Sequence, residues 1–428
     1  MAGRAFLPSP DSVRPGKLAT GAVFRLAEGM GHSSALGLAT GISLVALLGG
    51  CSGNSHSPQP EPAPVPLDYT CELIEEGFGP QGQIDIGVEV AVSGLEIPWS
   101  IGFLPDGSLL VTERGGDVRR VDPQGILDPE PVITVPAARA GEGGLLGLAI
   151  HPEFSENNYF YLFYTGTDDG ELNNRIERYI LAEDGRQAAL DRTILEGMPA
   201  NRYHDGGRLR FGSDGMLYAT MGDAGVPDLA PNPASLAGKV LRIDPDGGIP
   251  EDNPFPDSAA WLIGVRNSQG IDWREDGRMV LVDHGPSFEF GLRGLDEINI
   301  ADAGENLGWP AITGCETEPG LAAPSMSWKE AMPPGGLAIY TGDEIPQWKG
   351  DALIGVLGFG GATGHLHRIR LDAVGNVTLS EVYLLGEYGR LRDVIMGPDG
   401  GLYVTTSNCD GRGDCPDSKD VILRIGRP

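Results

Sequence analysis

The chain has 428 residues, among them 65 glycines and 34 prolines, and its formal net charge is −29. This much glycine and proline favours many short strands joined by turns over long helices, so we expect an all-β protein. Phosphate backbones bind clustered lysine and arginine, and the sequence has no basic run, which argues against nucleic acid as a partner. Solubility is the simpler explanation of the acidic composition.

Residues 1–50 have the features of a bacterial lipoprotein signal peptide. Residues 35–48 are apolar but short for a membrane span, and small residues lead directly to Cys51. We expect cleavage before Cys51 and lipidation of that cysteine, with translation starting at Met30. The protein would be exported and would contact a membrane only through its lipid, on the outer face of the cell membrane or in the periplasm. An ordinary secretory signal and an uncleaved anchor are the alternatives, and both also export the folded part.

Residues 51–82 are expected to form a flexible tether, because their first half is polar and rich in proline. Export permits disulfide bonds among the remaining cysteines. Cys409 and Cys415 flank a short polar loop that a bridge could close, which would leave Cys71 and Cys315 as a long-range pair. The sequence alone also allows the other pairings.

A unit of apolar strand, Asp-Gly turn and apolar strand recurs beyond residue 82. Glycine accepts the positive φ of a tight turn, so each copy predicts a β-hairpin. Three clear copies and three weaker ones are present: Ile101–Thr112, Leu209–Thr220, Val394–Thr405, Gly270–Val282, Leu148–Tyr164 and Leu337–Gly355. Six copies predict a six-bladed β-propeller over residues 83–428.

The propeller should be one domain, closed by Val88–Val92 as an added strand of the last blade. A pair of β-sandwiches is the alternative, but it would need a linker that residues 90–428 do not contain. Loops from all blades of a propeller converge on the axial channel, so we expect the functional residues there.

Polar residues stand at several of the predicted strand ends. His204 precedes a hairpin that Asp223 ends, so the carboxylate could orient the imidazole as a general base. A histidine taken alone is more often structural. Arg266 and Asn267 could act as fixed hydrogen-bond donors to an oxyanion. They could equally form a salt bridge and a turn at the end of a strand.

His365 and His367 lie on one face of a predicted strand, where two imidazoles could bind a transition metal. A third ligand is not evident, so the expectation is a solvated strand face. The sequence also lacks a phosphate-binding P-loop, a His-Glu-x-x-His zinc motif and a nucleophile elbow, which argues against nucleotide use, zinc proteolysis and serine hydrolysis.

A series of motifs follows in order from about Pro98 to the C-terminus. They are Gly-Glu-Gly-Gly-Leu-Leu-Gly-Leu, His-x-Gly-Gly-Arg-Leu, Arg-Asn-x-Gln-Gly, His-Gly-Pro, Asp-Glu-Ile-Asn, Gly-Trp-Pro and Gly-Arg-Leu-Arg-Asp. In this order they resemble the soluble pyrroloquinoline-quinone (PQQ)-dependent aldose (glucose/sorbosone) dehydrogenases, which are six-bladed propellers. The resemblance implies oxidation of a sugar at its anomeric hydroxyl to the lactone, with electrons passed from PQQ to an external acceptor.

By this resemblance His204 is the base that takes the anomeric proton, and Asp223 orients it. Glu142 stands where the family's glucose enzyme has glutamine near the reacting atoms. Arg266 would lie beside the reactive quinone carbonyl, and Asn267 would contact the cofactor.

The resemblance also implies that Arg390 and Arg392 pair with the carboxylates of the quinone. Backbone carbonyls of Gly285 and Pro286 would bind a calcium ion that polarises the quinone, and Glu297 would take part in a second, structural calcium site.

Two departures from the family pattern bear on quinone affinity. The chain has no lysine or arginine in the glycine-rich segment that begins at Gly358, where family members often carry one, and Glu142 adds negative charge beside an anionic cofactor. The missing cation keeps open a propeller that binds carbohydrate or protein without catalysis. A calcium-dependent lactonase on a similar propeller is a separate alternative, but it would use several side-chain carboxylates and amides, and the metal candidates here are mostly backbone carbonyls.

Overall fold

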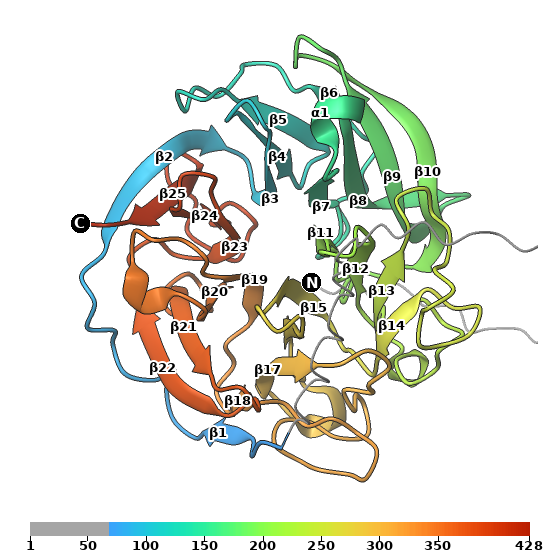
Figure 1. The fold of residues 1–428 in the computed structure, drawn as a ribbon, viewed down its shortest axis with the longest axis vertical. Helices are drawn as coiled ribbons and strands as arrows, with labels where there is room; N and C mark the ends of the chain where they lie inside the picture. The colour runs from blue at the N-terminus through green and yellow to red at the C-terminus, as the bar shows by residue number, and fades with distance from the viewer. Residues whose placement is uncertain (1–67) are drawn as a thin grey trace, which may run out of the picture. The chain divides into compact units, whose positions relative to one another are not determined.

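The structure is a computed structural model that describes residues 68–428 and is almost entirely β. Six sheets stand around a common axis, each with its first strand nearest the axis and its later strands farther out (Figure 1). The predicted all-β, six-bladed propeller is confirmed. The predicted signal peptide, Cys51 and the first part of the tether lie outside the described residues.

Blades 1 to 3 each consist of four antiparallel strands. Blade 1 contains β3 (Pro98–Phe103), β4 (Leu109–Glu113), β5 (Asp117–Val121) and β6 (Ile133–Thr134). Blade 2 contains β7 (Leu145–Ile150), β8 (Tyr159–Asp168), β9 (Glu171–Leu181) and β10 (Ala188–Pro199). Blade 3 contains β11 (Leu209–Phe211), β12 (Leu217–Met221), β13 (Lys239–Ile243) and β14 (Ala260–Ile263).

Blades 4 and 6 each recruit a strand from the N-terminal part of the described chain. Blade 4 contains β15 (Ser268–Trp273), β16 (Met279–Asp283), β17 (Asp296–Ala301), β18 (Met326–Trp328) and the added β1 (Glu72–Ile74). Blade 5 contains β19 (Pro334–Ile339), β20 (Ala352–Val356), β21 (His365–Leu371) and β22 (Val377–Tyr383). Blade 6 contains β23 (Leu391–Met396), β24 (Leu402–Thr406), β25 (Asp420–Gly426) and the added β2 (Gly87–Leu95).

Helical structure in the described residues is limited to single turns between strands. These turns are α1 (Phe154–Asn157), η1 (Pro227–Leu229), η2 (Glu289–Gly291) and η3 (Pro346–Trp348). No helix in residues 68–428 combines the length and the apolar character that crossing a membrane requires.

Each copy of the sequence repeat forms the inner hairpin of one blade. The second strands β4, β12, β16 and β20 are buried along their whole length, because the neighbouring blades cover both faces of each sheet. The turn glycine Gly215 has a φ of +77°, and Gly107 and Gly400 are alike at +86° and +81°. The Asp-Gly signal therefore marked real hairpin turns.

The ring closes where β2 pairs antiparallel with β25, so the first and last parts of the propeller share blade 6. The predicted closure by Val88–Val92 is confirmed, with Val88 opposite Ile425. The buried carboxylate of Asp420 adds to the closure, because it accepts the backbone N–H of Ile97 at 3.3 Å and that of Asn408 at 2.6 Å.

The last part of the predicted tether is ordered against the propeller. Strand β1 pairs in parallel with β18, and a disulfide joins Cys71 to Cys315 next to it. The second disulfide joins Cys409 to Cys415, so the pairing favoured by the sequence is confirmed. The ordered chain thus begins before residue 83, because pairing with blade 4 fixes a segment that composition alone indicates to be flexible.

Candidate active site

The predicted site residues lie at one end of the propeller. In an antiparallel hairpin the start of the first strand and the end of the second lie together. Glu142, His204, Arg266 and Arg390 come just before β7, β11, β15 and β23, while Asp223 comes just after β12. The fold therefore brings loops from several blades to the same end of the axial channel, as predicted.

His204 and Asp223 form a hydrogen-bonded pair. The Nδ1 of His204 lies 2.7 Å from Oδ1 of Asp223, and the Asp223 side chain is completely buried. An ionised carboxylate only accepts hydrogen bonds, so we assign the ring proton to Nδ1, which leaves Nε2 free to act as a base. His204 has a φ of +66°, an uncommon value for a residue other than glycine and one found often at functional sites.

Tight packing fixes this backbone. A Cβ added at Gly222 would lie 2.1 Å from the carbonyl oxygen of His204, so the glycine of the Gly-Asp motif is required there. Trp309 fixes the other end of the carboxylate, because its Nε1 donates to Oδ2 of Asp223 at 2.8 Å. The Gly-Trp-Pro motif was noted in the sequence, but this role of the tryptophan was not predicted.

Glu142 and Asn267 join the loops around the dyad. One Glu142 oxygen accepts the backbone N–H of His204 at 3.1 Å and the Asn267 amide at 3.3 Å. The Asn267 carbonyl oxygen accepts the N–H of Gly206 at 3.0 Å. Glu142 thus lies beside His204, and in this structure Asn267 positions the His204 loop.

Arg266 is nearly fully buried between blades 3 and 4. The buried Asp283 carboxylate accepts its backbone N–H at 2.8 Å, and Nη1 donates to the His284 carbonyl at 3.0 Å. The guanidinium carbon lies 5.3 Å from the centre of the Trp309 ring. Nη2 reaches the Glu289 carboxylate, a residue that the sequence analysis missed. The Arg266 guanidinium therefore pairs with an acid from the loop after β16 and not with an acid of its own turn.

Arg390 and Arg392 share one buried acid, Asp410, which the sequence analysis also missed. Asp410 Oδ2 lies 2.9 Å from Arg390 Nη2 and 3.7 Å from Arg392 Nη2. Arg390 also donates to the Gly358 carbonyl at 2.8 Å, so a cation does contact the segment in which the sequence has none. Arg390 precedes the first strand of blade 6, whereas Gly358 follows the second strand of blade 5, so the fold brings this cation to the segment from the neighbouring blade.

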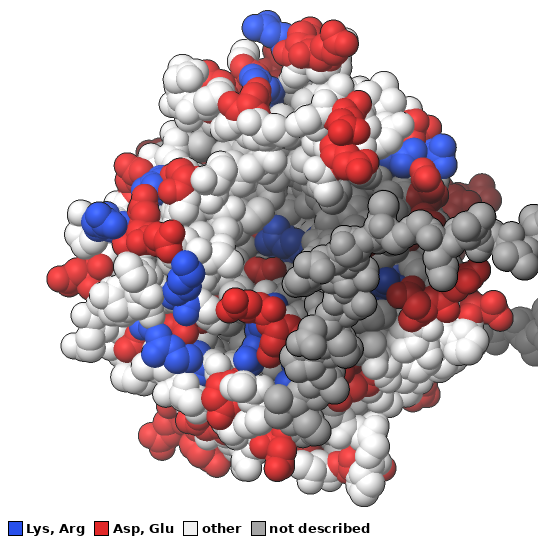
Figure 2. Space-filling view, viewed as in Figure 1, with Lys and Arg blue, Asp and Glu red and all other residues white. Residues whose placement is uncertain are grey.

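Arg390 and Arg392 are both buried in this part of the channel. The pKa of Arg392 is lowered to about 9, mainly by burial and in part by the charges of Arg390 and Arg114, while the Asp410 carboxylate opposes the shift. Within residues 68–428, the Nε atoms of Arg114 and Arg266 are buried without a hydrogen-bond partner. Basic and acidic side chains appear together in the central hollow, while many acidic ones lie around the periphery (Figure 2). Such a set of donors fits an anionic ligand.

The expected calcium ligands lie on the loop after β16 and on β17. The Pro286 carbonyl accepts the N–H of Gly294 at 3.1 Å, and the N–H of Gly285 donates to Asp296 at 3.1 Å. Burial and the nearby Asp283 charge raise the pKa of Glu297 to about 8, so this carboxyl group is largely protonated at neutral pH. In the described chain no three His, Cys, Asp or Glu side chains converge to hold a metal.

The expectation of a solvated face at His365 and His367 is wrong. Both side chains are fully buried on β21, with Nε2 of His365 3.1 Å from Nδ1 of His367. The ring of Phe78 packs against His365, and the ring of Trp328 packs against His367. In both pairs the ring centres are 5.1 Å apart. Phe78 comes from the segment that was assigned to the tether, so the sequence pattern of the strand could not reveal this cover.

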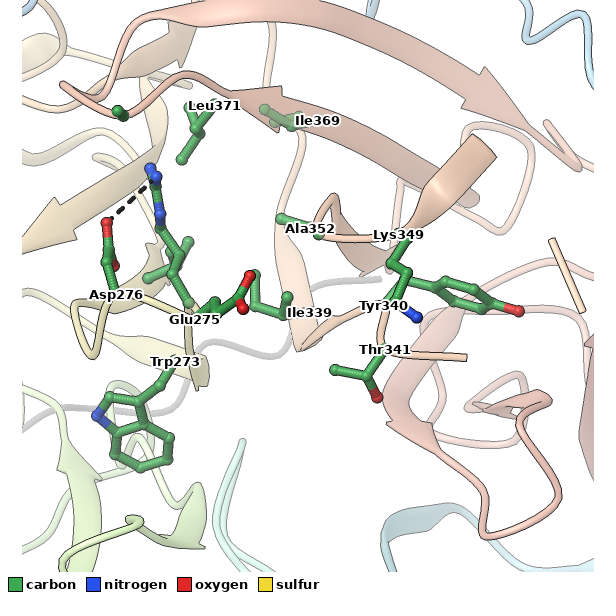
Figure 3. Close-up of a pocket in the computed structure, with 14 residues that line it drawn as sticks. Trp273, Glu275, Asp276, Ile339, Tyr340, Thr341, Lys349, Ala352, Ile369 and Leu371 are labelled. Atoms are coloured by element: carbon green, nitrogen blue, oxygen red, sulfur yellow. Dashed lines mark ion pairs between the residues drawn. The ribbon is translucent and has the colours of Figure 1, made fainter. Parts of the chain in front are cut away.

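A cavity of about 790 Å³ lies between blades 4 and 5, away from these residues (Figure 3). Apolar side chains such as Ile339, Ile369 and Leu371 line it, and an ion pair of Arg274 with Asp276 at 3.3 Å stands at its edge. That ion pair lies at the hairpin between β15 and β16, which is the opposite end of blade 4 from Arg266. The cavity is therefore separate from the dyad.

Comparisons with known proteins agree with this geometry. The model of the family described as Glucose / Sorbosone dehydrogenase matches residues 95–423. Aldose sugar dehydrogenase YliI of Escherichia coli is 33% identical over 351 residues, which cover 76% of this chain and 91% of the relative. Quinoprotein glucose dehydrogenase B of Acinetobacter calcoaceticus is 33% identical over 266 residues, 55% of this chain and 54% of that protein.

A solved structure, the PQQ-bound form of an aldose sugar dehydrogenase from Streptomyces coelicolor, is similar as well. It has 34% sequence identity and a TM-score of 0.71, over 80% of this chain and 98% of that chain. The family match spans all six blades, and the dyad and the arginines around it lie on motifs that the sequence analysis had assigned to the same family. The chain belongs to the glucose/sorbosone dehydrogenase family.

Proposed function

We propose that the protein oxidises an aldose at its anomeric hydroxyl to the lactone, with PQQ as the hydride acceptor and an external acceptor for the electrons. The observation that carries this proposal is the His204–Asp223 pair with Arg266 beside it. One nitrogen of the imidazole is held by the Asp223 carboxylate, and the other lies 3.7 Å from the Glu289 carboxylate, which Arg266 binds. Family membership supports the same reaction class.

In this proposal Nε2 of His204 takes the proton from the anomeric hydroxyl. Asp223 stabilises the imidazolium that forms, and the bonds from Trp309 and from Gly225 keep the carboxylate in place. PQQ, when bound, supplies a carbonyl carbon that accepts the hydride. Arg266 would hold an oxygen of the cofactor close to His204, because its guanidinium is a fixed, positively charged donor.

The residues present fit this cofactor. PQQ carries carboxylates. Arg390 and Arg392 provide buried guanidinium groups and Arg114 a half-buried one, all with lowered pKa values, and a nearby anion would stabilise their charged forms. The glycine-rich segment at Gly358 does not deprive the site of cations, because Arg390 contacts its carbonyls. This contact favours the dehydrogenase over a propeller that binds without catalysis.

The decisive experiment is reconstitution of the purified protein with PQQ and calcium, followed by dye reduction across a panel of aldoses. We expect turnover that falls by about a thousandfold or more in His204→Ala, because the general base is lost. Quinone binding by this variant should remain. Absence of turnover on every sugar, or unchanged turnover in His204→Ala, would overturn the proposal.

Calcium is the second part of the proposal. Carbonyl oxygens such as those of Gly285 and Pro286 are the hard ligands that calcium prefers, and binding would exchange the present contact between Pro286 and Gly294 for the ion. Chelation with EDTA should raise the dissociation constant for PQQ, and added calcium should restore it. Glu297→Gln tests the second calcium site, which we expect to contribute to thermal stability rather than to turnover.

We further propose that Cys51 carries a lipid and that the enzyme acts outside the cytoplasm. The two disulfides of the propeller agree with export. Incorporation of labelled palmitate, lost in Cys51→Ala, is the expected result. Secretion of an unlabelled protein would instead favour an ordinary signal peptide.

A further inference from the structure

One carboxylate stands between the two groups to which the chemistry is assigned. Oε1 of Glu289 lies 2.6 Å from Nη2 of Arg266 and 3.7 Å from Nε2 of His204. The other polar contacts of these two side chains point elsewhere, to Asp223 and to the His284 carbonyl. Glu289 thus meets the reactive nitrogen and the guanidinium at the place where a ligand oxygen would meet both.

The Glu289 carboxylate stabilises the buried guanidinium of Arg266. The Arg266 side chain is only 3% exposed, and a buried guanidinium without a counter-charge is strongly destabilising. Asp283 accepts the backbone N–H of Arg266, but the acid that reaches the guanidinium is Glu289. The Glu289 carboxylate therefore neutralises Arg266 in the cofactor-free protein.

The loop that carries Glu289 is closed by hydrogen bonds within itself, such as that from the Phe288 N–H to the Leu292 carbonyl at 2.7 Å, and Phe290 lies against Trp309 with ring centres 5.8 Å apart. Phe288 and Phe290, on either side of Glu289, have positive φ values of +83° and +52° and are 73% and 68% exposed. Strained backbone and little buried apolar surface are features of segments that move at low cost. The loop ends are fixed, by the bond from Gly285 to Asp296 and by the bond from Leu295 to the Trp328 carbonyl.

We propose that Glu289 is an internal substitute for the cofactor oxygen and competes with PQQ for Arg266. This inference rests on the proposed function. Quinone binding exchanges the Glu289–Arg266 ion pair for a quinone–Arg266 contact, so the loop must turn away. Glu289 thereby sets the affinity for the quinone, and it does so without taking part in the hydride transfer.

The test is a titration of the cofactor-free protein with PQQ, followed by quenching of tryptophan fluorescence. Glu289→Ala should lower the dissociation constant about tenfold, since a charge-assisted hydrogen bond no longer has to be broken. Glu289→Gln keeps the shape and loses the charge, so its dissociation constant should lie between those of Glu289→Ala and the wild type. The matched control is Glu330→Gln, which removes an exposed negative charge from the loop after β18 and should change the constant less than twofold.

A second measurement separates competition from a general charge effect. Acetate should occupy the vacated position in Glu289→Ala and raise the apparent dissociation constant for PQQ, while sodium chloride at equal ionic strength should not. Acetate should have no such effect on the wild type. Circular dichroism and thermal melting of each variant verify that it is folded.

The outcomes distinguish this inference from the proposed function. If the wild type binds PQQ and both Glu289 variants bind it no more tightly, the competition is wrong and the dehydrogenase proposal stands. An acetate effect no larger than that of chloride would also overturn the competition. If neither the wild type nor any variant binds PQQ, the cofactor itself is wrong, and the competition fails with it.

Discussion

Three donors around Asp223 decide which nitrogen of His204 is free. The imidazole Nδ1, the Gly225 N–H and the Trp309 indole all donate to this carboxylate, at 2.7, 2.7 and 2.8 Å. An asparagine would put an NH₂ group where one of these donors points, and the imidazole would turn or change its tautomer.

Asp223→Asn should therefore lower kcat by about a hundredfold or more while the dissociation constant for PQQ stays nearly unchanged. Trp309→Phe keeps an aromatic ring and removes only one donor, so it should lower kcat by about tenfold or less. Steady-state kinetics at saturating quinone measures both effects. Equal losses in the two variants would show that Asp223 acts through packing and not through the tautomer of His204.

Asp205, next to the base, should make stability depend on pH. Burial raises the pKa of Asp205 to about 7, above its ordinary value of 3.8, so the folded protein holds this proton more tightly than the unfolded chain does. The free energy of unfolding should therefore fall as pH rises from about 4 to 7.

Asp205→Asn cannot ionise and should lose this part of the dependence. Urea denaturation at about pH 5 and about pH 8 should show a smaller decrease for the variant than for the wild type, by an amount on the order of a few kcal/mol. Parallel pH profiles would contradict the assignment of the proton to Asp205.

The sequence predicted the residues that lie on regular strand ends and missed those that act from irregular loops. His204, Asp223 and Arg266 were found because each begins or ends a hairpin of the repeat. Glu289 and Asp410 lie in loops without periodicity that follow the second strands of blades 4 and 6, and each pairs with an arginine just before the first strand of the same blade. The path of an irregular loop, which decides this pairing, has no local signal in the sequence.

At the scale of elements, the two disulfides hold segments of different kinds. Cys71–Cys315 spans 244 residues and fixes β1 to blade 4, whereas Cys409–Cys415 spans six residues. The short loop contains Asp410, which binds Arg390, and Arg412, which lies 3.2 Å from Glu142. The long bridge therefore constrains the unfolded chain more, and the short one shapes the site.

Replacing Cys71 and Cys315 together by serine should lower the free energy of unfolding by about 2–4 kcal/mol and leave PQQ binding unchanged. The paired replacement of Cys409 and Cys415 should do the reverse, with a small change in stability and a severalfold higher dissociation constant for PQQ. Urea unfolding and quinone titration of both variants decide the matter. A loss of quinone affinity in the first variant alone would contradict this division.

The hairpins were the elements most readily predicted, because an Asp-Gly turn between apolar runs is a local signal. Strand β21 shows the opposite case. His365 and His367 alternate as on an open strand face, yet Phe78 and Trp328 cover them. A local pattern cannot report that a segment almost 300 residues away supplies the cover.

At the scale of the whole molecule, stability depends on closure of the ring. One carboxylate oxygen of Asp420 accepts hydrogen bonds from the backbone N–H groups of Ile97 and Cys409. The other oxygen accepts hydrogen bonds from the backbone N–H of Asn408 and from the Thr406 hydroxyl. These contacts join the turn between β2 and β3 to the end of β24.

Asp420→Ala should lower the free energy of unfolding by about 3 kcal/mol or more, since it leaves buried N–H groups without partners. Unfolding should remain a single transition, because each blade depends on both of its neighbours. Asp420→Asn keeps the side-chain shape and should cost less. Loss of blade 6 in a separate, earlier transition would contradict a ring that unfolds as one unit.

The pairing of β2 with β25 also bears on the synthesis of the protein. Ile97, beside β2, is made 323 residues before Asp420, its bonding partner at β25. At ribosomal rates of about 5–20 residues per second, roughly 15–65 seconds pass between the synthesis of β2 and the synthesis of β25. During this interval it is an unpaired edge, and its exposed Glu89 and Ser93 reduce the tendency of such an edge to pair with other chains. We therefore expect the polar residues of β2 to limit aggregation of the nascent chain until β25 is made.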